Sequence, residues 1–104
     1  MIIMAVSAPI KPEHRDEMIQ AAITVQNATR PEPGCITYVF YTEVADPNSF
    51  FVYEVWESAG ALELHMQQEH TRTFLEKVGK TAAGSINAER YDVPADSKQS
   101  PTIK

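Results

Sequence analysis

The stretch FFVYEVWESAGALELHMQQEHTRTF, residues 50–74, contains the pattern that decides the fold. Residues 50–57 are rich in aromatic and β-branched side chains, which predicts a single strand. Because side chains alternate along a strand, Glu54 and Trp56 share one face, and Tyr53 lies on the other. Each face carries large apolar groups, so we expect this strand to be buried on both sides.

The residues after this strand predict a helix that carries two histidines. Ser58 stands where an N-cap belongs, because its hydroxyl can accept a hydrogen bond from a free backbone N–H of the first turn. Leu62 and His65 share one helical stripe, so His65 points inward, and the pattern breaks near residues 69–70. An inward histidine can be a core side chain with satisfied nitrogens, but Glu54 on the inward face of the strand also favours a functional role.

The remaining segments complete a βαββαβ order of elements. Strands are predicted for residues 1–10, 35–44, 50–57 and 85–93, and helices for residues 12–29, 58–68 and 71–80. The inward stripe of the first helix is predicted to be Met18, Ile19, Ala22, Ile23 and Gln26. A turn at residues 46–49 makes an antiparallel hairpin of the second and third strands. This order predicts an α+β, ferredoxin-like domain over residues 1–93, with a four-stranded antiparallel sheet and both helical segments on one face.

The other face of that sheet needs a cover. The second and third strands look apolar on both faces, and the sequence predicts no further helix, so a second copy of the chain is the simplest cover. We therefore expect a homodimer that packs sheet against sheet. The polar tail, residues 94–104, has no core of its own and is either mobile or laid across the neighbouring subunit.

Composition argues against several classes of partner. The chain has 104 residues and a net charge of −5, without a run of Lys and Arg to fit a phosphate backbone, so we expect no nucleic acid. No apolar run reaches the roughly 18 residues of a membrane span, and a strand-like segment follows Met1 in place of a signal sequence, which favours a cytoplasmic protein without membrane contact. Cys35, the single cysteine, is interpreted as a small apolar side chain at a strand start.

Four motifs resemble one known family. They are Glu32-Pro33-Gly34-Cys35, Tyr53-Glu54-Val55-Trp56-Glu57-Ser58, Leu62-Glu63-Leu64-His65, and Glu69-His70 followed by Phe74. With them the sequence resembles the antibiotic biosynthesis monooxygenase (ABM) superfamily up to about residue 93, and is most similar to its small quinol monooxygenase-like members. The resemblance implies a dimeric α+β barrel with a cavity between sheet and helices in each subunit. It also implies cofactor-free chemistry, in which deprotonation of a small aromatic quinol or polyphenol gives an anion that reacts directly with dioxygen.

The resemblance also indicates which residues form the site. His65, His70 and Glu54 would be catalytic, with both histidines closing the cavity from the helix. The expected substrate-binding residues are Trp56, Tyr38, Phe74 and Tyr91, of which the tyrosines could donate hydrogen bonds or serve as packing. Haem-degrading relatives use an asparagine on the first strand and an axial histidine in the second helical segment; here the first strand has no Asn and residues 74–78 have no His, so no haem is expected. A glycine-rich loop for a nucleotide or flavin is also missing.

His65 and His70 are the candidate bases, because imidazole has an unperturbed pKa of roughly 6.5 whereas phenols ionise near about 10. Glu54 could orient a histidine, or could form a structural ion pair. A metal is not expected, because the two histidines are five positions apart instead of three or four, unless a break in the helix brings them together. Three functions stay open: a cofactor-free monooxygenase, an isomerase or decarboxylase-like enzyme on a small oxygenated metabolite such as a quorum signal, and a non-catalytic small-molecule-binding dimer.

Overall fold

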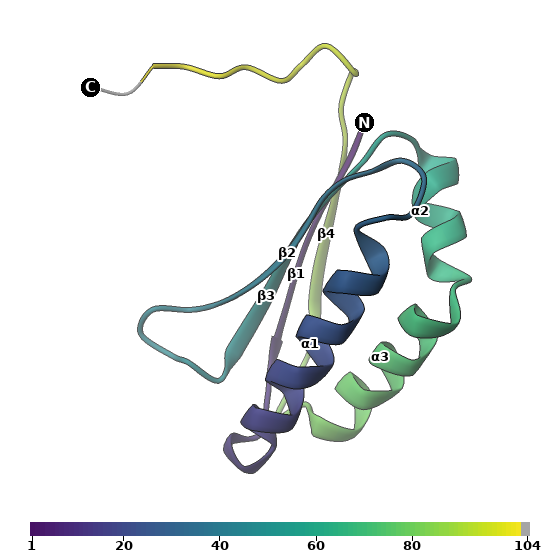
Figure 1. Cartoon of the computed structure of the whole chain (residues 1–104). Helices are drawn as coiled ribbons and strands as arrows, with labels where there is room; N and C mark the ends of the chain where they lie inside the picture. Colours follow the sequence, from purple (N-terminus) through teal and green to yellow (C-terminus); the bar gives the residue numbers. More distant parts are fainter. Residues whose placement is uncertain (103–104) are drawn as a thin grey trace.

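The computed structural model describes residues 1–102 and shows one sheet with helices on one of its faces (Figure 1). The elements are β1 (Ile2–Pro9), η1 (Pro12–His14), α1 (Arg15–Thr29), β2 (Cys35–Thr42), β3 (Ser49–Trp56), α2 (Ala59–Met66), α3 (Glu69–Thr81) and β4 (Asn87–Asp92). This order confirms the predicted α+β, ferredoxin-like fold. The last two residues of the predicted tail, 103–104, lie outside the described residues. Within residues 1–102, every helix is too short or too polar to cross a membrane.

The sheet places Glu54 and Trp56 beneath the helices. Its strands are antiparallel in the order β2-β3-β1-β4. Cross-strand partners share a face, so the pairs Ile2–Trp56 and Met4–Glu54 lie on the same side. Trp56 and Glu54 are 0% and 7% exposed, as expected for the face that the helices cover. Tyr53 lies on the opposite face and is 37% exposed, which confirms the predicted alternation along β3 but not its burial on both sides.

Helix α2 begins where the sequence predicts, α1 follows a 3-10 turn at the predicted start, and α3 begins two residues early, while the inward face of α1 differs from the prediction in part. The hydroxyl of Ser58 caps α2 by accepting a hydrogen bond from the backbone N–H of Ala61 at 3.1 Å. The buried residues of α1 are Met18, Ala22, Val25 and Thr29. The prediction that Ile23 points inward is wrong, since this side chain is 45% exposed. Ile23 follows Ala22 by one position, which turns it about 100° around the helix axis and away from the sheet.

The outer face of the sheet, opposite the helices, is partly open. Ile36, Tyr41 and Tyr53 are exposed there by 53%, 53% and 37%. Residues 97–99 of the tail, together with Ile36 and Tyr53, line a hollow of about 560 Å³ on this face. The tail then extends away from the sheet (Figure 1). The outer face thus has apolar surface for a second layer, and the sheet-on-sheet homodimer stays a prediction.

Candidate active site

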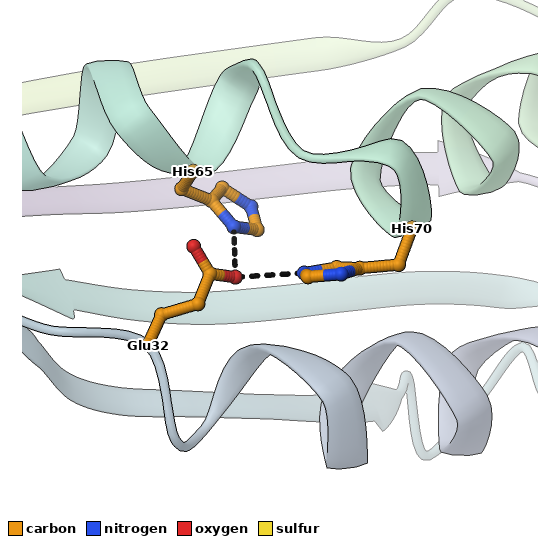
Figure 2. Close-up of side chains that lie close together, drawn as sticks. All are labelled: Glu32, His65 and His70. Atoms are coloured by element: carbon orange, nitrogen blue, oxygen red, sulfur yellow. Dashed lines mark hydrogen bonds and ion pairs between the residues drawn. The ribbon is translucent and has the colours of Figure 1, made fainter.

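A break between α2 and α3 brings the two histidines onto one carboxylate (Figure 2). His65 lies in the last turn of α2, and His70 lies at the start of α3. Nδ1 of His65 is 2.9 Å from Oε2 of Glu32, and Nε2 of His70 is 2.8 Å from the same oxygen. This break is the exception that the spacing argument against a metal allowed, so the five-residue spacing does not keep the two histidines apart. The three atoms lie within 4.8 Å of one another.

Glu32 is held in place by a rigid loop, and sequence reasoning missed its role. The residue lies between Pro31 and Pro33, whose rings restrict the backbone. The next residue, Gly34, has a φ of 82°, and a Cβ there would approach the Cβ of Ala61 in α2 to 2.5 Å. Only glycine therefore allows the loop to pack this closely on α2. An acidic residue between two prolines was the available sequence signal, since such a side chain is presented by a fixed backbone.

His65 is almost completely buried and packs between aromatic rings. Its side chain is 3% exposed, and its ring centroid lies 4.7 Å from that of Trp56 and 5.4 Å from that of Tyr38. The hydroxyl of Thr71 lies 3.3 Å from Nδ1. Burial lowers the pKa of His65 below its ordinary value, although the hydrogen bond and charge of Glu32 act in the opposite direction. The neutral imidazole is therefore the favoured form at neutral pH.

The hydrogen bonds to Glu32 also fix which nitrogen of His65 carries the proton. An ionised carboxylate only accepts hydrogen bonds, so Nδ1 of His65 and Nε2 of His70 must both donate to it. In the neutral ring of His65 this leaves a lone pair on Nε2. That nitrogen has no hydrogen-bond partner among residues 1–102. The geometry thus presents Nε2 of His65 as a free proton acceptor.

Glu54 is not the carboxylate that orients His65. Its side chain accepts a hydrogen bond from Nε1 of Trp56 at 2.9 Å, whereas Glu32 accepts the hydrogen bond from Nδ1 of His65. Burial raises the pKa of Glu54 to about 6; the Trp56 hydrogen bond lowers it, and the nearby charge of Glu32 raises it. Glu54 therefore exchanges its proton close to neutral pH. Among residues 1–102, Glu54 therefore neither orients a histidine nor forms an ion pair, because the loop after α1 supplies Glu32 as the carboxylate that contacts His65.

A cavity of about 260 Å³ lies between the sheet and the helices. This volume is slightly below the range of about 300–1,000 Å³ that is typical of ligand pockets. Most of its lining is apolar, and its polar lining residues are Tyr38, Glu54, His65 and Thr71. Three further lining residues, Met66, Leu75 and Ile86, are 48%, 47% and 48% exposed. They mark the side on which the cavity meets the surface, so a small, largely apolar molecule can enter there.

The cavity includes some of the sequence-predicted site residues but not others. Tyr38 and Phe74 line it together with His65, and burial, with the charges of Glu54 and Glu32, raises the pKa of the Tyr38 hydroxyl, which keeps it a donor. Trp56 is fully buried and is not among the residues that line the cavity. His70 lines a different groove, between α1 and α3. Tyr91 pairs with Ile3 on the outer face and is 49% exposed, so the structure separates it from the cavity.

Comparison with known proteins places these features in a family. The sequence profile of the family described as "Antibiotic biosynthesis monooxygenase" matches residues 1–77. An uncharacterised protein of Synechocystis sp. is 38% identical over 76 residues, which are 73% of this chain and 52% of that protein, so the chain spans about half its length. YcnE of Bacillus subtilis, provisionally named a monooxygenase, is 25% identical over 89% of this chain and 98% of its own. A crystal structure of an antibiotic biosynthesis monooxygenase superimposes with a TM-score of 0.85 at 24% identity, covering 90% of this chain and 99% of that one.

Proposed function

The chain belongs to the antibiotic biosynthesis monooxygenase family, and on that premise we propose that it oxidises a small quinol or polyphenol with dioxygen, using His65 as the base. One observation carries this proposal. His65 lines an apolar cavity while Glu32 holds Nδ1, which leaves the lone pair of Nε2 free. This is the arrangement by which a carboxylate prepares a histidine for general-base catalysis.

The first step is removal of a proton from the substrate. A phenolic hydroxyl has a pKa near about 10, so few molecules are ionised at neutral pH without a base. Nε2 of His65 accepts this proton, and the ionised Glu32 stabilises the resulting imidazolium through Nδ1. The hydroxyl of Tyr38, which stays protonated, can donate a hydrogen bond to the substrate oxygen from the cavity wall.

The second step joins the quinolate to dioxygen. The anion gives two electrons to O₂ as a C–O bond forms at a ring carbon, and the peroxide takes the proton from the His65 imidazolium. Loss of the proton on that carbon then breaks the O–O bond and releases water. Quinol and O₂ thus become hydroxyquinone and H₂O, and His65 returns to its neutral form. Glu54, with a pKa of about 6, is a second proton-exchanging group that lines the same cavity.

The apolar cavity supports this chemistry in two ways. Its aliphatic and aromatic lining excludes water, which protects the anion and strengthens the hydrogen bonds inside. Its volume of about 260 Å³ restricts the substrate to a small ring system. Phe74 and Tyr38 supply aromatic surface on which such a ring can pack.

We also propose that two chains pack through their outer faces. The exposed apolar side chains of Ile36, Tyr41 and Tyr53 support this proposal, because burying them against a second sheet removes them from water. Light scattering after size exclusion should give twice the chain mass, and Tyr53→Glu should give one chain mass with unchanged circular dichroism. A monomeric wild type at micromolar concentration would contradict the dimer.

Oxygen consumption tests the proposed reaction. A panel of small hydroquinones should drive O₂ uptake, and His65→Gln should lower turnover by about 100-fold or more, which is the usual contribution of a general base. His14→Gln is the matched control, because His14 also meets a glutamate but lies on the surface. Turnover that His65→Gln leaves unchanged would remove His65 from the mechanism. Product formation without O₂ would instead indicate an isomerase or decarboxylase-like reaction.

A further inference from the structure

We infer that Glu32, His65 and His70 bind one divalent cation of the zinc type. The ligand atoms would be Oε2 of Glu32, Nδ1 of His65 and Nε2 of His70, which lie within 4.8 Å of one another. Two imidazoles and a carboxylate are a donor set that suits Zn²⁺, with water in the fourth position. The site itself follows from these three side chains and does not depend on the proposed reaction.

To admit the ion, the two contacts to Glu32 must lengthen, and the two imidazole nitrogens, which lie within 4.8 Å of each other, must draw closer. Zinc binds nitrogen and oxygen at about 2.0–2.2 Å in a tetrahedron, which separates neighbouring ligand atoms by about 3.3–3.5 Å. The two contacts to Glu32 are now 2.9 and 2.8 Å, so each would open by roughly 0.5 Å. The break between α2 and α3 places His70 on its own helix, so its ring can move without disturbing His65.

The cluster is both shielded and accessible. The side chains of Glu32 and His65 are 10% and 3% exposed, so water competes weakly for their ligand atoms. His70 is 26% exposed and lines a groove of about 390 Å³ between α1 and α3. An ion can reach the carboxylate from this groove without passing through the substrate cavity. The net charge of −5 also favours the approach of a cation.

Binding would change the tautomer of His65. A ligating Nδ1 needs its lone pair, so the proton of the neutral ring must move to Nε2. Nε2 would then donate a hydrogen bond instead of accepting a proton. If His65 is the base, as the proposed function holds, zinc therefore inhibits turnover while sitting outside the cavity. This last consequence rests on the proposed function; the binding site does not.

Titration with ZnCl₂ tests the site on chelator-treated protein without a polyhistidine tag. Calorimetry should show one Zn²⁺ per wild-type chain. His70→Gln and Glu32→Gln should each weaken binding by more than about 100-fold, since even residues behind the ligands typically contribute about 10–100-fold. The His14→Gln variant should bind zinc like the wild type, because His14 and Glu17 form a surface pair that offers only two ligand atoms. No uptake by wild type, or equal uptake by all four proteins, would overturn the site.

A second measurement uses only the wild type, so it does not depend on whether the variants fold. NMR of the imidazole nitrogens shows which nitrogen of His65 carries the proton. The proton of His65 should lie on Nδ1 without metal and on Nε2 with saturating ZnCl₂. An unchanged tautomer at saturation would overturn coordination through Nδ1. Turnover measured in the same samples separates the two proposals. Zinc binding with full quinol oxidation would overturn the inhibition and the base role of His65, and would leave the metal site standing.

Discussion

Histidine meets glutamate in two regions of this molecule, and burial is what distinguishes them. At the start of α1, Nδ1 of His14 contacts Glu17, with side chains 37% and 42% exposed. Beneath the loop after α1, Nδ1 of His65 contacts Glu32, with side chains 3% and 10% exposed. The same pair of groups is a solvated surface contact in the first region, where water screens it and offers alternative partners. In the second region the contact is buried and fixes which nitrogen of the neutral His65 ring carries the proton.

The partners around each pair enlarge this difference. Lys77 donates to Glu17 at 2.7 Å, and this hydrogen bond, before that of His14, lowers the pKa of Glu17. Glu32 instead receives a second imidazole, that of His70. On the surface, the ammonium group of Lys77 still donates to Glu17 when His14 is removed. The buried carboxylate depends on the two imidazole rings that contact it, so removing either the carboxylate or a ring leaves polar groups unpaired where little water reaches them.

The largest predicted effect is therefore on stability when the two carboxylates are removed in turn. Glu32→Ala should lower the free energy of unfolding by about 3 kcal/mol, because it breaks two hydrogen bonds to a charged group and leaves His65 without its partner. Glu17→Ala should leave the unfolding curve nearly unchanged. Urea denaturation at one fixed protein concentration measures both.

Glu32→Gln refines this first prediction, since the amide oxygen can still accept a hydrogen bond from at least one ring. It should lose less stability than Glu32→Ala. Equal losses in Glu32→Ala and Glu17→Ala would show that burial does not separate the two regions.

The second prediction concerns how stability depends on pH. It uses Glu54, a buried carboxyl whose hydrogen-bond partner is Trp56 instead of an imidazole. Burial raises the pKa of Glu54 from 4.5 to about 6. The stability that the neutral carboxyl provides is complete below pH 4.5 and is lost as the pH rises through 6. Relative to Glu54→Gln, the wild type should therefore lose about 2 kcal/mol between pH 4 and pH 8. Chemical denaturation across that range measures the difference.

Glu17→Gln supplies the opposite case for the same experiment. The lowered pKa of Glu17 means that its contribution is present above its ordinary value and is lost as the pH falls through the folded value. The Glu17 difference should therefore shrink as the pH falls below 4.5, whereas the Glu54 difference changes as the pH rises above 4.5, so the series is extended below pH 4 for Glu17→Gln. A Glu54→Gln curve parallel to that of wild type would contradict the raised pKa.

The sequence predicted the elements well because local patterns determine them. Hydrophobic alternation in β3, the cap at Ser58 and the two prolines after α1 each act over a few residues. The carboxylate partner of His65 could not be found in this way, because Glu32 lies 33 positions earlier and only the packing of a loop brings it close. Glu54 was chosen instead because its face could be deduced from β3 alone.

The assignment of Tyr91 failed for a related reason. Every residue of β4 is exposed, so its sequence, NAERYD, does not show which face turns toward the helices. The pairing of Tyr91 with Ile3 across the sheet determines its side, and that register depends on the whole fold. Tyr38 does line the cavity, because its cross-strand partner is Glu54, which lies on the face beneath the helices.

The smallest predicted effect is a shift in one titration, and it tests the contrast between the regions most directly. Burial lowers the pKa of His65 below 6.5, while Glu32 raises it by a hydrogen bond and by its charge. NMR of the imidazole C–H signals should therefore give a midpoint below 6.5 for His65, and Glu32→Gln should move it lower still. Because the folded pKa is depressed, the stability linked to neutral His65 is present above the unfolded pKa and lost as the pH falls through the folded one. His14→Gln, which identifies the surface histidine's signal, should leave the His65 midpoint in place. A midpoint that rises in Glu32→Gln would mean that Glu32 does not stabilise the imidazolium, and the base assignment would lose its partner.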